Sequence, residues 1–190
     1  MKRILAEYLD DNFNKDFKWR TSILFFSFYG TFSFYYLSNE AILTLDGITI
    51  VKILTTLTVG FLFGNLTTFP FAFIVKLIGN IFHIQTSYKD IVKTFTIAYK
   101  PHLITSLLII CKIIIAPDKN IQLAADSIGL LLVFSLILNL LISAFGIASL
   151  ILLFQGLMKV QNLPLKKTIL YFLIASIAFS PVYLLLIKYK

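Results

Sequence analysis

The chain has 190 residues, of which 58% are hydrophobic and 14% charged, with a mean hydropathy of +0.89. A soluble domain is about 45–50% apolar and about 25% charged, and the excess apolar surface here is too large for one core of this size, so we expect lipid to cover it. A net charge of +8 would indicate a nucleic-acid partner in a soluble protein. In a membrane protein basic loops set the orientation, so we expect no nucleic-acid partner.

Residues 1–20 are predicted to form a cytoplasmic segment with an amphipathic helix. Apolar residues recur there at helical spacing while charged residues occupy the other face, a pattern typical of a helix that lies on a bilayer. Lys18, Trp19 and Arg20 then combine basic and aromatic side chains, which favours the boundary between headgroups and hydrocarbon. We therefore expect this segment to precede a membrane domain over residues 21–190.

Five apolar stretches follow in that domain. The first is close to the roughly 20 residues that a helix needs to cross a bilayer, the second and fourth are longer, and the third is short. We therefore predict an all-α, polytopic transmembrane bundle with five spans and amphipathic interfacial helices. The predicted spans cover residues 21–38, 48–79, 102–116, 128–158 and 169–187.

The distribution of basic residues predicts the orientation of these spans. Lysines and arginines are frequent in the N-terminal segment, between the second and third spans, and between the fourth and fifth. The two opposite loops hold four acidic residues and a single lysine, Lys119. Because cytoplasmic loops are rich in Lys and Arg, five spans place the N-terminus inside and the C-terminus outside.

Residues 87–101, SYKDIVKTFTIAYKP, are predicted to form a second amphipathic helix, on the membrane surface. Ser87 and Asp90 have the spacing of a capping box, and Pro101 predicts a corner before the third span. Ile91 and Phe95 belong to an apolar face that we expect to embed in lipid. The other face carries a basic stripe that we expect to bind anionic headgroups, with a solvated cytoplasmic face as the alternative. The basic stripe consists of Lys89, Lys93 and Lys100.

Polar and small residues also lie inside the second and fourth spans. Two interpretations are open: helices that pack through small residues and hydrogen bonds, or the lining of a polar path. We favour packing, with Gly60 and Gly64 permitting close approach, and we expect the four polar residues of the second span to share one face. The set is Thr55, Thr58, Gly60, Gly64, Asn65 and Thr68 in the second span and Ser135, Asn139 and Ser143 in the fourth.

No motif in the sequence specifies a reaction. His83 and His102 lack the acidic pattern of a zinc site, no glycine precedes the Lys-Ser/Thr pair of a phosphate loop, and no serine lies in GxSxG. We therefore predict that the protein is not an enzyme and needs neither a cofactor nor a metal.

Three segments carry a family likeness. The second span ends in LIGNIF, the amphipathic YKDIVKTFTIAYKP leads into the third span, and IASLILLFQGLMKVQNLPLKKTILYFLIA joins the fourth to the fifth. These segments resemble the Yip family, membrane proteins named for interacting with Ypt/Rab GTPases, and especially its prokaryotic branch. In that family the amphipathic segment ends in an aromatic residue, one further residue and a proline, and Tyr99 and Pro101 match these positions. The family also has a glycine at the end of a long span, and Gly156 matches it.

The resemblance implies a five-span α-helical domain with a cytoplasmic N-terminus, in agreement with the charge distribution. Eukaryotic members act in vesicle traffic between early secretory compartments and bind partner membrane proteins. Their acidic cytoplasmic motif and the glycine-tyrosine pair of their third span have no counterpart here, so the resemblance does not imply Rab binding. It implies an integral protein of a bacterial inner membrane.

Together these observations predict a non-enzymatic membrane protein that organises or binds other membrane components. The expected partners are membrane lipids, other membrane proteins or a second copy of the chain. A small transporter or channel subunit that uses the polar faces of the second and fourth spans is the alternative. The two functions differ in whether those faces pack on each other or meet a hydrated cavity.

Overall fold

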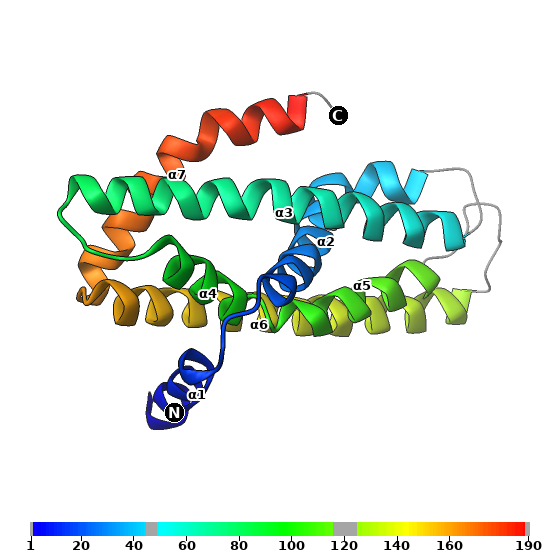
Figure 1. The fold of residues 1–190 in the computed structure, drawn as a ribbon. Helices are drawn as coiled ribbons and strands as arrows, with labels where there is room; N and C mark the ends of the chain where they lie inside the picture. Colours follow the sequence, from blue (N-terminus) through cyan, green and yellow to red (C-terminus); the bar gives the residue numbers. More distant parts are fainter. Residues whose placement is uncertain (1, 45–48, 116–124, 189–190) are drawn as a thin grey trace.

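The computed structural model describes residues 2–44, 49–115 and 125–188, and within these ranges the chain forms α-helices and no strand (Figure 1). The prediction of an all-helical fold is confirmed, because helices occur at all five predicted apolar stretches. The helices are α1 (Lys2–Asn14), α2 (Trp19–Thr44), α3 (Thr49–Ile81), α4 (Tyr88–Ala98), α5 (His102–Ile115), α6 (Ala125–Gln161) and α7 (Leu165–Lys188).

Two of the described helices are long and apolar enough to cross a membrane, over Ile50–Ile81 in α3 and Leu131–Gln161 in α6. α4 and α5 together meet the same requirement although a bend of 44° separates them, so they add a third crossing if they form one span. The described residues therefore support two or three candidate spans, and the number five stays a prediction.

α3 and α6 are the two longest helices, and they run in the same direction on opposite sides of the bundle (Figure 1). α2 packs against α3 and α5, whereas α4 contacts α2, α3 and α6. α7 packs along α3 and diverges from α6 after the turn that joins them (Figure 1). No Cα atom in the described part of α3 lies within 8 Å of one in α6. The two long helices are therefore held apart by the shorter ones.

Local sequence signals explain where several helices begin and end. Ser87 Oγ accepts the Asp90 N–H at 3.1 Å and lies 2.6 Å from the Asp90 carboxylate, which confirms the predicted cap of α4. Pro101 stands between α4 and α5 at their 44° bend, as predicted for the corner. His83 and Asn162 follow α3 and α6 with φ angles of 57° and 51°, a left-handed conformation that ends helices.

α2 and α3 cross with their backbones in contact. A Cβ atom on Gly60 would lie 2.5 Å from Thr31 Cα of α2. A Cβ atom on Gly64 would overlap the carbonyl oxygen of Phe26, and one on Gly30 would overlap that of Gly60. Backbone atoms cannot retreat as flexible side chains do, so this approach requires glycine on both helices.

α4 lies inside the bundle. Ile91 and Val92 have no exposed surface, and apolar residues of α2, α3 and α6 surround them. The expectation that this face embeds in lipid is therefore wrong. An amphipathic pattern identifies a face that needs apolar cover, and protein provides that cover as well as lipid does. Hydrogen bonds fix α4 to three helices: Tyr88 to Phe69 O of α3 at 3.1 Å, Thr96 to Ser22 Oγ of α2 at 2.8 Å, and Ser149 of α6 to Ala98 O at 2.7 Å.

Replacing Gly64 with alanine should lower the stability of the folded protein. Even one methyl group there meets the backbone of α2, and overpacking of this kind costs about 1–3 kcal/mol. Thermal unfolding in detergent measures the effect. Gly129→Ala is the matched control, because no atom lies within 4 Å of a Cβ atom at that position. Equal melting temperatures for the two variants would show that α2 and α3 do not cross at Gly64.

Candidate functional site: a cavity between the long helices

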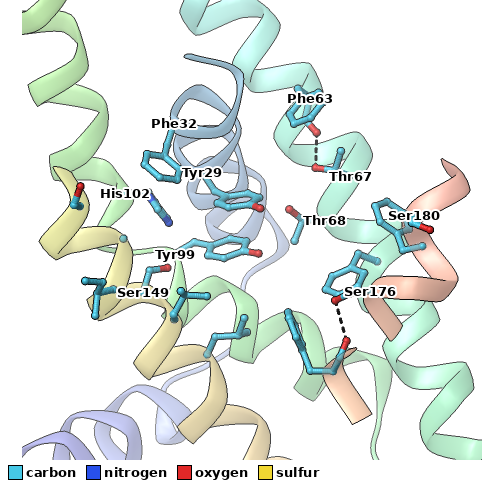
Figure 2. A pocket seen from close by; sticks show the side chains of 18 residues that line it. Tyr29, Phe32, Phe63, Thr67, Thr68, Tyr99, His102, Ser149, Ser176 and Ser180 are labelled. Atoms are coloured by element: carbon cyan, nitrogen blue, oxygen red, sulfur yellow. Dashed lines mark hydrogen bonds between the residues drawn. The ribbon is translucent and has the colours of Figure 1, made fainter. Parts of the chain in front are cut away.

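A cluster of aromatic rings lies where α4 ends. Tyr99 stacks on Tyr29 of α2, with ring centroids 4.0 Å apart and planes inclined by 9°. Phe26 and His102 contact the Tyr99 ring edge to face, at 5.9 and 5.7 Å. Pairs of this kind contribute about 0.5–1.5 kcal/mol beyond the area they bury, so the cluster holds Tyr99 in one orientation. Figure 2 shows the hydroxyls of both tyrosines directed toward Thr68 of α3.

Gly156 brings α6 close to the side of α4. A Cβ atom on Gly156 would lie 2.6 Å from Thr94 Cγ2, and Thr94 is held in place because its hydroxyl donates to Asp90 O at 2.9 Å. Tyr99 lies at the end of α4 and Pro101 at the following bend. The three residues that match the family motif are thus brought together around one short helix.

A cavity of about 590 Å³ lies beside the stacked tyrosines, between α3 and α6 (Figure 2). Residues of α3, α6 and α7 form most of its wall, and Tyr29, Tyr99 and His102 close it on the other side. The space exists because α3 and α6 do not meet and α7 diverges from α6. Its volume is in the range of small-molecule sites, about 300–1,000 Å³.

Most polar groups in the cavity wall already have protein partners. The hydroxyls of Thr67 and Ser149 donate to backbone carbonyls at 2.7 Å, and His102 Nδ1 lies 3.1 Å from Thr105 Oγ1. Thr68 differs: it is 2% exposed, its polar neighbour is the Tyr99 hydroxyl, and its Oγ1 makes no hydrogen bond of ordinary geometry to the described residues. An unsatisfied buried hydroxyl is costly, so Thr68 marks a point where a bound molecule would find a partner.

The cavity opens to the outside of the bundle between α6 and α7. Its rim includes Ile147 and Leu150 of α6, which are 59% and 52% exposed, and Ser180 of α7, which is also exposed. The described lining residues include no Asp, Glu, Lys or Arg. The described part of the chain also holds no group of three His, Cys, Asp or Glu suited to a metal ion. The wall therefore suits an uncharged, largely apolar molecule that enters from the side.

The predicted polar residues of α3 have different surroundings and do not line one path. Thr68 lines the cavity. Asn65 lies against α2, where its amide donates to Ser27 Oγ at 3.0 Å. Thr55 is half-buried and Thr58 is exposed, and neither is among the lining residues.

The polar residues predicted in α6 divide in the same way. Ser143 lies on the rim of the cavity. Asn139 contacts α5, because its Oδ1 accepts a hydrogen bond from Lys112 Nζ at 2.8 Å, and that ammonium lies 5.4 Å from the centre of the Tyr35 ring. Ser135 is half-buried and does not line the cavity. One residue from each helix of the predicted set therefore reaches the cavity.

The basic stripe contacts the end of α1. Lys93 Nζ donates to Phe13 O and Lys15 O, both at 2.6 Å, and Lys100 Nζ donates to Asn12 Oδ1. Carbonyls at the C-terminal end of a helix lack intrahelical partners and carry partial negative charge, so lysines are suited to this position. Burial, and secondly the nearby charge of Lys15, lower the pKa of Lys100 below its ordinary value.

Two further lysines contact α1 or the segment that follows it. Lys89 lies 5.7 Å from the centre of the Phe17 ring, and Lys159 of α6 forms an ion pair with Asp10. Leu9 is buried in the same region. Binding of anionic headgroups by the basic stripe stays a prediction, and it would compete with these contacts to α1.

A sequence model of the Yip1 domain matches residues 5–187, nearly the whole chain. This chain belongs to the Yip family. Yip1-domain proteins are a generally non-catalytic family of membrane proteins, and together with the apolar helices the match makes this chain an integral membrane protein. No curated protein and no solved structure matches it.

The sequence does not point to Tyr29 or His102 as residues of the cavity, although both line it in this Yip1 domain. Nothing local distinguishes Tyr29 from the many aromatic residues of its span or pairs it with Tyr99. A histidine that opens an apolar helix directly after Pro101 is, however, a signal for a buried polar contact, besides the metal-ligand role that the sequence excludes. His102 is 2% exposed and contacts Tyr29 and Tyr99.

Proposed function

We propose that this Yip-family protein is non-enzymatic and binds another membrane component in the cavity between α3, α6 and α7. The component is a lipid or an apolar part of a partner protein. One observation carries the proposal: about 590 Å³ of space opens sideways from the bundle, with no charged side chain among its described lining residues. Protein interiors are close-packed because voids forfeit contacts, so a space of this size is best explained by an occupant.

The basic stripe is a second point at which membrane lipids are proposed to bind. Lys89, Lys93 and Lys100 attract anionic headgroups at about 1 kcal/mol per lysine near a surface, provided that α1 releases them. Other membrane proteins and a second copy of the chain are further proposed partners. The exposed apolar residues along α6, such as Leu132, Leu136 and Leu140, offer surface to a protein partner or to lipid.

A small transporter or channel subunit is the second candidate, and the position of the cavity between α3 and α6 is the observation in its favour. A polar path would be expected to continue past Asn65 and Asn139, which instead bond to α2 and α5. The hydroxyls of Thr67, Ser149 and Ser176 are bonded to backbone carbonyls. We therefore favour binding over transport as the function of the cavity.

We also propose that the chain crosses a bacterial inner membrane five times with its N-terminus inside. We further propose that it belongs to the prokaryotic branch of the Yip family. Alternate crossing is supported by the arrangement of helix ends in Figure 1. The starts of α3 and α6 lie at one end of the bundle, and the turns after them lie at the other. Lys76, Lys166 and Lys167 belong to the second end, which is the side that the positive-inside rule makes cytoplasmic.

Single cysteines test the topology in a Cys111→Ser background, because Cys111 is exposed and would react itself. With five spans, Asp46→Cys between α2 and α3 should react with a membrane-impermeant maleimide added to intact cells. Leu165→Cys, at the exposed start of α7, should react only after the membrane is opened. Labelling of both positions from outside would contradict the five-span arrangement.

Filling the cavity tests the binding function. Gly146 lines the cavity, and the nearest atom to a Cβ atom there is Phe32 Cζ at 3.8 Å, an ordinary contact distance. Gly146→Phe therefore places a ring in the space without moving the backbone. Native mass spectrometry of protein extracted in mild detergent should show a bound membrane component on the wild type and none on the variant.

Gly129→Phe is the matched control for that experiment. It adds the same ring to the same helix at a position with no atom within 4 Å of a Cβ atom and outside the cavity lining. The control should retain the bound component. Equal retention by Gly146→Phe and Gly129→Phe would overturn the proposal that the cavity is the binding site.

A further inference from the structure

We propose that the cavity binds a neutral amphiphile with a single hydrocarbon chain, whose hydroxyl or ester oxygen hydrogen-bonds to Thr68. This inference rests on the proposed function and specifies its ligand. Three observations limit which ligand fits: the size of the cavity, the absence of charge among its described lining residues, and the buried Thr68 hydroxyl.

The volume excludes a transmembrane helix as the occupant. An α-helix with side chains is about 10–12 Å wide and rises 1.5 Å per residue, so about 590 Å³ holds only about four or five residues, little more than one turn. A hydrocarbon chain is far thinner and fits between the side chains of Phe71, Leu153 and Phe172, which belong to three different helices of the wall. The occupant is therefore a chain-shaped molecule.

The described wall offers no counter-ion to a charged headgroup. A carboxylate, phosphate or ammonium in an apolar site needs a partner charge, and the described lining residues include neither acidic side chains nor lysine or arginine. Neutral oxygens need only a hydrogen bond. The polar end of the ligand is therefore a hydroxyl or an ester.

Thr68 provides that hydrogen bond. In a helix a threonine hydroxyl often donates to the carbonyl four residues earlier, which for Thr68 is Gly64 O. That carbonyl instead lies 3.3 Å from Thr67 Oγ1, and Thr68 Oγ1 is buried without a hydrogen-bond partner of ordinary geometry among the described residues. Figure 2 shows Thr68 beside the Tyr29 and Tyr99 hydroxyls, and its low exposure places it away from the opening of the cavity. The polar end of the ligand lies there, and its chain extends toward the opening between α6 and α7.

Equilibrium binding of tritiated 1-monooleoylglycerol to the purified full chain tests this assignment. The wild type should bind the probe saturably. Thr68→Val removes the hydroxyl and keeps the shape of the side chain, so it should bind the probe about 3–10-fold more weakly, which is the loss expected for one neutral hydrogen bond. Thr58→Val is the control, since Thr58 is exposed on the same helix and outside the cavity. Thr68→Val should melt no lower than Thr58→Val, because it removes a buried hydroxyl that lacks a hydrogen bond of ordinary geometry.

Two competitors separate the parts of the proposal. Unlabelled 1-octadecene, which has no oxygen, should compete equally well in wild type and Thr68→Val, and oleate at neutral pH should compete poorly. Loss of the Thr68→Val effect while Gly146→Phe still blocks binding would overturn the assignment of Thr68 and leave the binding function in place. Tighter binding of oleate than of monooleoylglycerol would overturn the neutral ligand. Unchanged binding by Gly146→Phe would overturn the proposed function itself.

Discussion

The apolar face of α4 is enclosed by α2, α3 and α6, and this contact holds the two longest helices apart. Ile91 and Val92 are completely buried, the Tyr88 and Thr96 hydroxyls bond to α3 and α2, and the Ala98 carbonyl accepts a hydrogen bond from Ser149 of α6. With α4 in place, α3 cannot pack against α6. The backbones of α2 and α3 touch at their glycines, and α6 comes close to the Thr94 side chain of α4 at Gly156. These tight contacts leave the helices little room to shift and fill the cavity.

The cavity follows from that spacing. Tyr99 ends α4, stacks on Tyr29 and forms one wall, while the divergence of α7 from α6 leaves the opposite side open. The same helix presents its basic face to α1, so one short segment determines both the interior site and the position of the N-terminal helix. The residues that resemble the family motif all lie at or against α4: Tyr99 and Pro101 follow the helix, and Gly156 comes close to Thr94.

Local features were predictable from the sequence, and partners distant in the chain were not. The cap at Ser87, the corner at Pro101 and the helices at the five apolar stretches depend on neighbouring residues. The expectation of lipid at the apolar face of α4 is wrong, because periodicity identifies an apolar face without identifying its neighbour. Spacing within α3 likewise could not reveal that Asn65 bonds to Ser27 of another helix, while Thr68 has the Tyr99 hydroxyl beside it but no hydrogen bond of ordinary geometry. The cavity depends on helix directions, which no local pattern encodes.

Disulfide trapping in membranes tests most directly whether α3 and α6 are held apart. A disulfide requires Cα atoms about 4.4–6.8 Å apart. In a Cys111→Ser background, the pair Ser27→Cys and Asn65→Cys replaces two side chains that are hydrogen-bonded at 3.0 Å across α2 and α3, and it should cross-link rapidly under mild oxidation. The pair Phe71→Cys and Leu153→Cys, which line the cavity from α3 and α6, should remain reduced, because no Cα atom in the described part of α3 lies within 8 Å of one in α6. Equal cross-linking of both pairs would show that the long helices close on each other, and would contradict the account.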